Sequence, residues 1–340
     1  MSVRIGIRLP ACRPVDQLAR AAQRAEELGF DEVWVPDSQL LWRDVFATLT
    51  AMALRTERLR LGTAVTNVET RHPSVVASGA RTVAEAAPGR FVLGVGVGNS
   101  AVEPVGLRST TQANLRERLG QVRDLLGGAE VDFGPVRSRL RDPDAELPVF
   151  VAASGPKNLR LAGEIADGVI LLSGVSPATL TAGLGRVREG AEASGRSLAD
   201  LEIVVSAYCH VTDDVEADAR MLKPICAGIA QKGGAAALAL AGIDVQVPPV
   251  VPGLYPDTVH AEDWAEAVRV CGQWITDEMA VRFAQAFCLF GTTAQIAARI
   301  DEVAAAGATN VFLQHVGSYD LPYELMESFA DNLSARERSA

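Results

Sequence analysis

The sequence alternates between short apolar segments and amphipathic helical segments, and this alternation is repeated eight times. Each apolar segment has the length of a strand and is followed by residues with helical periodicity. The segments are 3–9, 31–37, 59–65, 90–98, 147–154, 167–173, 201–211 and 309–317. Because they are apolar on both faces, they are typical of parallel strands covered by helices. The pattern predicts an α/β fold, a closed (β/α)8 TIM barrel, and disfavours an open doubly wound sheet.

Two stretches depart from this alternation. Residues 131–140 have the pattern of a small hairpin. Residues 212–290 separate the last two strands and are too long for one crossover helix. We expect this second stretch to be a mostly helical insertion at the mouth of the barrel. Residues 1–340 would then form one domain.

Charge and cysteine content restrict the class of protein. The net charge of -10 disfavours nucleic acid and anionic membranes as partners, because phosphates would repel the chain. The five cysteines form no C-x-x-C pair, which favours free buried thiols over disulfides or a metal site. The sequence begins directly with a strand pattern and contains no long apolar run. We therefore expect a soluble cytoplasmic protein without a metal, acting on a small molecule.

A glycine run follows the fourth predicted strand. Gly96, Gly98 and Ala101 match the G-x-G-x-x-A form of a dinucleotide-binding loop. Such a loop follows the first strand, however, and needs an acidic residue about 20 residues further on. Neither condition holds here, so the dinucleotide interpretation is disfavoured. The glycines either let a flat ligand lie against the backbone or form a packing bend.

A candidate anion site follows the fifth predicted strand, in the stretch "AASGPKN". The strand runs into Ser154 and Gly155, and Pro156 opens a helix. Free N–H groups at a helix N-terminus bind anions such as phosphate. The alternative is an ordinary serine cap at Ser154.

Four stretches resemble a known family: "AEELGFDEVWVPDS", "LGTAVTNVETRHPSVVASGARTVAEAAPGRFVLGVGVGNSAVEPVGL", "PVFVAASGPKNLRLAGEIADGVIL" and "AAGATNVFLQHVG". They are similar to the bacterial-luciferase-like flavin and deazaflavin oxidoreductases. The similarity is strongest to the branch that uses coenzyme F-420, which includes methylenetetrahydromethanopterin reductase and F-420-dependent glucose-6-phosphate dehydrogenase. Residues 212–290 carry no useful resemblance.

This resemblance implies an oxidoreductase that transfers a hydride between coenzyme F-420 and a small organic substrate with a C=C, C=N or C–OH group. Two alternatives stay open: an FMN-dependent luciferase-like monooxygenase, and a catalytically silent flavin- or deazaflavin-binding protein. We also expect a homodimer.

The resemblance also implies the cofactor site. Asp37 would border the deazaflavin ring, and a non-prolyl cis peptide between Ala64 and Val65 would form a bulge behind it. The glycine loop would line the polar edge of the ring, and the loop before the fifth helix would hold the phosphate of the tail. The expected site consists of Asp37, Ala64, Val65, Asn67, Gly96, Gly98, Asn99, Ala153, Ser154, Gly155, Pro156 and Lys157.

The chain departs from its relatives at three usual acid/base positions, which hold Arg8, Ser38 and Asn99. We therefore carry over neither the sugar nor the pterin substrate.

The candidates for the proton donor are His315, His72 and Glu103, or a water held by Asn99. His72 alternatively caps a helix. We predict that His315, an imidazole titrating at a pH of about 6–7, is the donor. The predicted catalytic residues are Asp37, Asn99 and His315.

Overall fold

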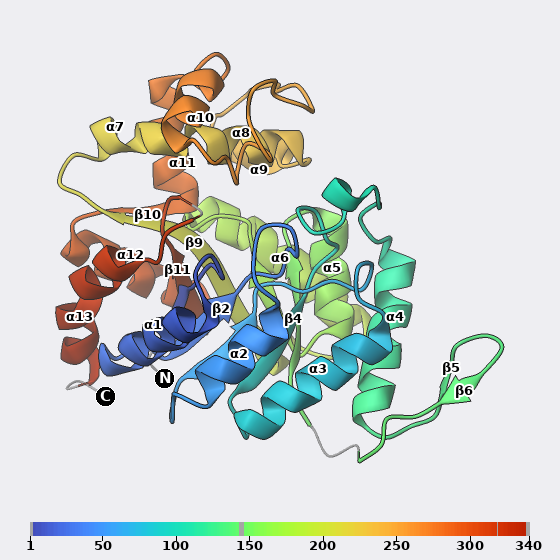
Figure 1. Cartoon of the computed structure of the whole chain (residues 1–340). Coiled ribbons are helices and arrows are strands. Elements are labelled where there is room, and N and C mark those ends of the chain that lie inside the picture. The colour runs from blue at the N-terminus through green and yellow to red at the C-terminus, as the bar shows by residue number, and fades with distance from the viewer. Residues whose placement is uncertain (1–2, 143–145, 318, 338–340) are drawn as a thin grey trace.

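The chain folds into a closed barrel of parallel strands, in a computed structural model that describes residues 3–142, 146–317 and 319–337 (Figure 1). In these residues one sheet has the order β10-β9-β11-β1-β2-β3-β4-β7-β8, and a further pairing of β8 with β9 closes it. This confirms the predicted TIM barrel. The barrel strands are β1 (Arg4–Arg8), β2 (Glu32–Val35), β3 (Arg60–Thr63), β4 (Phe91–Val95), β7 (Val149–Ala153), β8 (Gly168–Leu171), β9 (Glu202–Val211) and β11 (Asn310–Gln314).

Helices cover the outside of the barrel, as Figure 1 shows. Those that alternate with the strands are α1 (Val15–Glu27), α2 (Val45–Ala53), α3 (Pro73–Ala86), α4 (Gln112–Leu126), α5 (Pro156–Ile165), α6 (Pro177–Ala193), α12 (Thr293–Ala305) and α13 (Tyr323–Glu337). The predicted hairpin is also present, because β5 (Val131–Asp132) pairs antiparallel with β6 (Arg137–Ser138).

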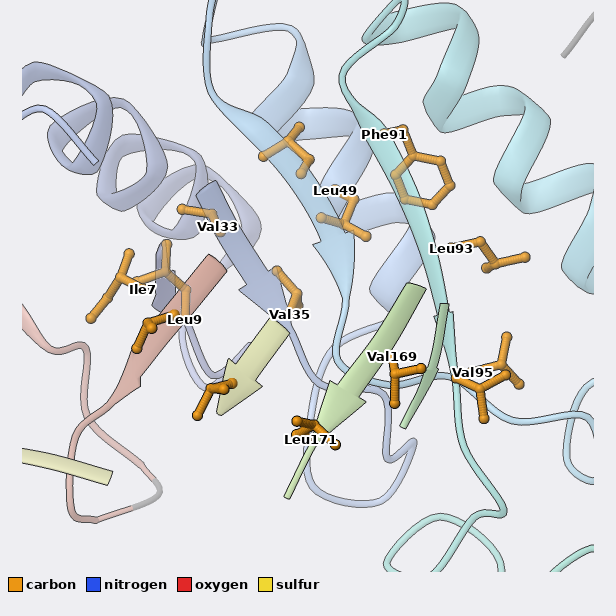
Figure 2. Packing of buried hydrophobic residues seen from close by; sticks show 14 of the residues in the cluster. Ile7, Leu9, Val33, Val35, Leu49, Phe91, Leu93, Val95, Val169 and Leu171 are labelled. Carbon is orange, nitrogen blue, oxygen red and sulfur yellow. The ribbon is translucent and has the colours of Figure 1, made fainter. Parts of the chain in front are cut away.

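The main hydrophobic core lies between the strands and these helices. Alternate strand residues such as Val33 and Val35 point outward and are fully buried against helix residues such as Leu49 (Figure 2). A second set of alternate residues fills the barrel itself. There Trp34 stacks on Phe312 with ring centroids 5.5 Å apart. Burial on both faces explains why the strands are apolar throughout.

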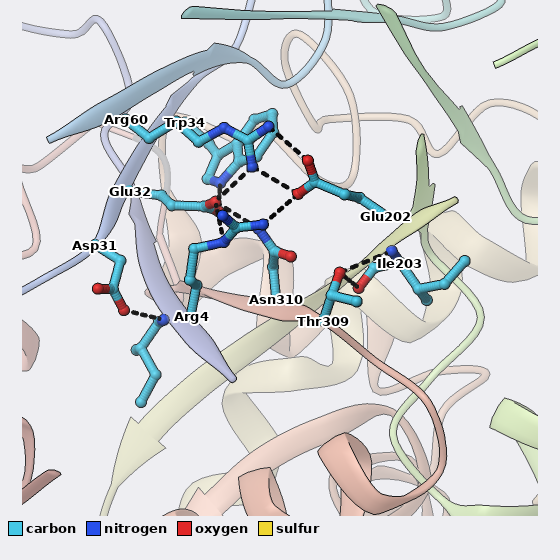
Figure 3. A network of polar contacts seen from close by, with 10 residues as sticks. Arg4, Asp31, Glu32, Trp34, Arg60, Glu202, Ile203, Thr309 and Asn310 are labelled. Carbon is cyan, nitrogen blue, oxygen red and sulfur yellow. Dashed lines mark hydrogen bonds and ion pairs between the residues drawn. The ribbon is translucent and has the colours of Figure 1, made fainter. Parts of the chain in front are cut away.

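The amino ends of the strands are closed by a buried ion-pair network (Figure 3). Its members are the first residues of five strands: Arg4, Glu32, Arg60, Glu202 and Asn310. Arg60 contacts both Glu32, at 3.2 Å, and Glu202, at 2.7 Å. Burial raises the pKa of Glu32, although the nearby arginines oppose this shift. The charged layer leaves the carboxyl ends of the strands as the open end of the barrel.

Residues 212–290 contain the helices α7 (Val215–Asp218), α8 (Lys223–Gln231), α9 (Ala235–Leu240), α10 (Trp264–Cys271) and α11 (Asp277–Phe287). They enclose a hydrophobic cluster of their own, which includes Phe283 and Phe287. One element was not predicted. Strand β10 (Cys288–Gly291) pairs with the second half of the long strand β9, outside the closed barrel.

This insertion contacts the loops at the carboxyl ends of the strands. Lys232 of α8 forms an ion pair with Glu103 at 2.7 Å, and the ring of His260 lies 6.2 Å from that of Trp42. Tyr319 donates a hydrogen bond from Oη to the backbone oxygen of His260, at 2.9 Å. The insertion is therefore attached to several loops at the open end.

The cysteines and the helices bear on disulfide bonds and on membrane spans. All five cysteines are buried and free, as predicted. In the described part of the chain, no helix is long and apolar enough to cross a membrane.

Candidate functional site

The ends of β2 and β3 are joined by an ion pair that the sequence analysis did not anticipate. Arg71 donates from Nε and Nη2 to the two carboxylate oxygens of Asp37, at 2.8 and 3.0 Å. Thr66 donates from Oγ1 to the same carboxylate at 2.6 Å. Asp37 is 4% exposed. Its carboxylate is therefore occupied by protein groups, and the contacts do not support the catalytic role predicted for it.

Arg71 extends this contact to the start of helix α2. It donates from Nη2 to Asp44 at 2.8 Å, and Asp44 accepts the N–H of Ala47 as the helix cap. Burial alone would lower the pKa of Arg71, but the hydrogen bonds to the two carboxylates raise it above its ordinary value. The guanidinium thus holds two loops together at the open end of the barrel.

The peptide bond between Ala64 and Val65 is cis, as the resemblance implied. Strand β3 ends at Thr63, and regular pairing with β4 resumes only at Thr66, which forms an isolated bridge with Val95. Ala64 and Val65 therefore leave the ladder as a bulge and pack on the interior cluster of the barrel. The predicted cis peptide and bulge are confirmed, whereas their place behind a cofactor ring stays a prediction.

Asn67 is 1% exposed, and the two ends of its amide have different environments. Its Oδ1 accepts the backbone N–H groups of Glu69 and Thr70, at 3.0 and 2.8 Å. Two N–H donors on one side fix the orientation of the amide. Its Nδ2 is buried and has no hydrogen-bond partner in the described residues. A buried donor without a partner is costly, and a bound water or ligand can satisfy it.

The packing of the protein requires glycine at positions 96 and 98. A Cβ on Gly96 would lie 2.6 Å from Cγ2 of Val65. Gly98 has a φ of +75°, and its Cβ would lie 2.9 Å from Cγ1 of Val102. The idea that the missing side chains leave room for a flat ligand is therefore wrong at these two positions. The packing-bend alternative explains them, and contact of their backbone with a cofactor stays a prediction.

The polar residues next to this run form contacts across neighbouring loops. Asn99 is exposed, and its Oδ1 accepts a hydrogen bond from Ser109 at 3.1 Å. The hydroxyls of Ser38 and Ser100 lie 2.7 Å apart, which joins the ends of β2 and β4. Glu103, a candidate proton donor, is engaged by Lys232. Of the polar residues in this loop, the exposed Asn99 remains accessible.

The N-terminus of α5 has no side-chain cap. Its cap residue is Gly155, and no side-chain oxygen accepts from the first turn of the helix. The alternative of an ordinary serine cap is therefore wrong for Ser154. Ser154, Pro156 and Lys157 are exposed, whereas Ala153 is buried at the end of β7. Uncapped N–H donors together with an exposed lysine provide the chemistry of an anion site.

A chain of hydrogen bonds connects the Asn67 loop with α4 and α5. Asn114 donates to Glu69 at 2.6 Å, and Gln112, two residues earlier on α4, donates to Asn158 at 3.1 Å. The loops after β3 and β7 are therefore fixed relative to each other. Helix α4 thus links the loop after β3 to the first turn of α5.

His315 does not have the environment expected of a donor that titrates near neutral pH. Both ring nitrogens are buried without a hydrogen-bond partner in the described residues. Burial and the charge of Arg8 lower the pKa of His315 to about 4, and Asp320 opposes this only in part. The expectation of titration at a pH of about 6–7 is therefore wrong.

The remaining histidines have structural partners. His72 caps α3 by accepting the N–H of Ser74 on Nδ1, so the capping alternative is confirmed. His210 pairs with Asp218, and His260 pairs with Asp257. The described residues contain no group of three or more histidine, cysteine or acidic side chains arranged for a metal ion.

Sequence reasoning missed the role of Arg71. Arg71 stands in the "TRHP" stretch, which the analysis used only as a mark of resemblance. The sequence did contain a signal for this ion pair. Asp37 follows the second strand and Arg71 follows the third, and the ends of neighbouring strands lie close together in a barrel.

Comparisons with known proteins agree with this architecture. The sequence model of the luciferase-like monooxygenase family matches residues 2–310. The chain is 29% identical over 315 residues to 5,10-methylenetetrahydromethanopterin reductase of Methanolobus tindarius, covering 90% of this chain and 92% of that protein. It is 39% identical over 201 residues to F-420-dependent glucose-6-phosphate dehydrogenase of Beutenbergia cavernae, covering 53% of this chain and 60% of that protein.

Among solved structures, the fold is similar to that of the coenzyme F-420-dependent tetrahydromethanopterin reductase of Methanopyrus kandleri. The TM-score is 0.77 at 22% identity, and the match covers 99% of each chain. The family match spans nearly all of the barrel, including the bulge after β3 and the uncapped start of α5. This chain belongs to the luciferase-like monooxygenase family.

Proposed function

We propose that this chain is an oxidoreductase that transfers a hydride between coenzyme F-420 and a small organic substrate. The observation that carries the cofactor assignment is the similarity to F-420-dependent glucose-6-phosphate dehydrogenase, which is 39% identical to this chain over 53% of its length. The fold is also similar to that of the coenzyme F-420-dependent tetrahydromethanopterin reductase. When bound, coenzyme F-420 gives or accepts the hydride at its C5 atom, so the protein contributes positioning and electrostatics.

The residues of this chain fit such a cofactor at two places. The Nδ2 of Asn67 is a buried donor without a partner, suited to a carbonyl oxygen at the polar edge of a ring. The first turn of α5, with Lys157 beside it, is suited to the phosphate of the tail. Asp37 and Arg71 hold the two loops that flank the bulge at Ala64 and Val65. We assign to Asp37 a positioning role, through Arg71 and Thr66.

The proton that accompanies the hydride needs a donor other than a protonated histidine. His315 is neutral near pH 7, because burial lowers its pKa to about 4. Glu103 is paired with Lys232. We assign the proton to a solvent water oriented by the exposed side chain of Asn99, which was one of the alternatives from sequence.

The first test is a titration of the apo-protein with coenzyme F-420 and, separately, with FMN, followed by fluorescence. The proposal expects micromolar or tighter binding of F-420 and at least tenfold weaker binding of FMN. FMN is the specific competitor because the matching family is described as luciferase-like monooxygenases. Preferential binding of FMN would overturn the proposal and would support an FMN-dependent monooxygenase instead.

The second test separates an enzyme from a silent binding protein. Reduced F-420 labelled with deuterium at C5 is incubated with the protein and a small-molecule extract, and transfer of the label is followed by mass spectrometry. Transfer that depends on the protein supports the proposal. Tight binding of F-420 without transfer to any extract component would favour the silent binding protein.

A further inference from the structure

Strand β1 carries an arginine at each end of the barrel. Arg4 is the first residue of β1 and Arg8 is the last. Arg8 is in register with Trp34, which belongs to the cluster inside the barrel. Because side chains alternate along a strand, Arg4 and Arg8 both project to the interior side. Arg8 therefore stands at the open end of the barrel, on the axis side of the strand.

The two arginines differ in their partners. Arg4 contacts Glu202 at 2.5 Å and Glu32 at 3.5 Å in the network at the closed end. Arg8 forms no hydrogen bond and no ion pair with any described residue, and it is only partly exposed. Its one specific contact is with the ring of Trp42, whose centroid lies 6.0 Å from Cζ. A partly buried guanidinium without an anion is costly unless a ligand supplies the charge.

No described carboxylate forms an ion pair with Arg8, although Asp320 and Asp257 act on its neighbours His315 and Tyr208. The titratable groups that act on it are Tyr208 and Cys12. Burial raises the pKa of Tyr208 and of Cys12 above their ordinary values, so both side chains are neutral near pH 7. Arg8 itself stays protonated at any pH that the protein tolerates. It is a cation that forms no ion pair with a described residue, in a chain whose net charge is -10.

Other polar groups without partners lie around Arg8. The Nε1 of Trp42, the ring that Arg8 contacts, is buried without a hydrogen-bond partner in the described residues. The ring nitrogens of His315 are also buried without a described partner within 3.5 Å, and both the charge of Arg8 and the backbone of Asp320 act on that ring. The local set thus comprises a guanidinium fork, an indole N–H and a neutral imidazole N–H. These are donors, and together they call for an acceptor with several lone pairs.

We propose that Arg8 binds a carboxylate of the substrate, so that the protein acts on an organic acid. This inference rests on the proposed function, because it names the substrate class of the same open end. A carboxylate presents two coplanar oxygens that match the guanidinium fork and leaves lone pairs for further donors. Its position on β1 is separate from the Asn67 loop after β3 and the start of α5 after β7, where we place the cofactor.

The experiment uses a matched series of probes that differ in charge and hardly in shape: formate, acetate, crotonate and cinnamate, each beside its amide. Binding to the wild type, to Arg8→Met and to Arg8→Lys is measured by calorimetry, with and without F-420. The matched control is Arg13→Met, which removes an arginine from the next loop that already has a partner, Asp320. Inorganic phosphate is added as a further probe.

The proposal expects at least one carboxylate to bind the wild type at least tenfold more tightly than its amide. Arg8→Met should abolish this preference, Arg8→Lys should keep part of it, and Arg13→Met should keep it whole. The proposal is overturned if no carboxylate loses affinity in Arg8→Met. It is also overturned if phosphate shows the larger Arg8-dependent affinity.

Two further measurements, of unfolding temperature and of F-420 affinity, distinguish a substrate-binding role of Arg8 from a structural role and from a role in the cofactor site. Without ligand, Arg8→Met should unfold at the same or a higher temperature than the wild type, because it removes an unpaired charge. A clear loss of stability would reveal a structural role and would count against the proposal. F-420 affinity is measured on the same samples: a loss in Arg8→Met equal to the loss of carboxylate binding would place Arg8 in the cofactor site and overturn the inference. If F-420 fails to bind the wild type while carboxylates bind through Arg8, the proposed function fails and this inference stands.

Discussion

Arg71 holds both carboxylate oxygens of Asp37, through Nε at 2.8 Å and Nη2 at 3.0 Å. The two residues come from the loops after β3 and β2, so the pair fixes the relative position of two strand ends beside the bulge at Ala64 and Val65. The side chain of Asp37 is 2% exposed and that of Arg71 is 16% exposed. An ion pair this buried contributes mainly by avoiding an unpaired charge.

Replacing Asp37 should therefore cost stability as well as function. Asp37→Ala leaves the guanidinium of Arg71 with only the half-exposed Asp44, and we expect a loss of about 3 kcal/mol in the free energy of unfolding. Urea denaturation measures this loss. Asp320→Ala, which breaks an exposed pair with Arg13, should cost less than about 1 kcal/mol. An Asp37→Ala variant as stable as the wild type would return Asp37 to the list of catalytic candidates.

Gly155→Val should weaken cofactor binding without unfolding the protein. A Cβ at this position meets no protein atom within 4 Å, and its φ of -83° suits any residue. The added side chain would instead stand where an anion approaches the first turn of α5. We expect at least a tenfold loss of F-420 affinity by fluorescence titration and an unchanged unfolding temperature. Gly120→Ala on α4, where a Cβ also meets open space, is the control and should bind normally.

Asn67→Asp tests the buried donor without a partner. The substitution keeps the oxygen that accepts the N–H groups of Glu69 and Thr70, so the turn should survive. It replaces Nδ2 by an oxygen that cannot donate. We expect the F-420 affinity of the folded protein to fall at least tenfold, and the unfolding temperature to fall as well, because the new carboxylate is buried. Asn332→Asp, on α13, is a control that should bind F-420 like the wild type. Full retention of affinity in Asn67→Asp would remove Asn67 from the ring site.

His315 should make the protein less stable in mild acid. Its pKa in the folded protein is about 4, below the ordinary value of 6.5, so the unfolded chain takes up a proton that the folded chain refuses. This contribution to stability is therefore complete above pH 6.5 and is lost as the pH falls toward 4. His315→Gln should lose less stability than the wild type between pH 7 and pH 5, as measured by urea denaturation. Parallel losses in the two proteins would show that the ring is not buried in neutral form.

The ion-pair network at the amino ends of the strands should stabilise the fold without affecting cofactor binding. Arg60→Met removes the cation that lies between Glu32 and Glu202, and we expect a loss of about 3–5 kcal/mol in the free energy of unfolding. Arg4→Met removes a more exposed arginine from the same network and should cost less. F-420 affinity of the folded fraction should be unchanged in both variants. A selective loss of affinity would show that the two ends of the barrel are coupled.

The sequence by itself determined the barrel, because its evidence is local. Strand and helix periodicity can be recognised within short windows, and eight repeats of one pattern admit few architectures. The bulge at Ala64 and Val65 and the anion site before α5 were also predicted, the first from resemblance and the second from the proline that opens the helix. Strand β10 was missed, since its four residues pair with residues of β9 that lie eighty positions earlier in the chain.

Tertiary structure decided what each candidate side chain does. The sequence leaves two explanations for Gly96 and Gly98, ligand space or a packing bend, and the folded chain favours the bend because Val65 and Val102 occupy the space beside them. Asp37 was predicted to be catalytic before the folded chain placed Arg71 against it. The burial of a side chain, its hydrogen-bond partners and its pKa depend on residues that are distant in sequence. A local sequence pattern therefore does not predict them. For the same reason only the folded chain shows that Arg8 forms no ion pair with any residue that the structure describes.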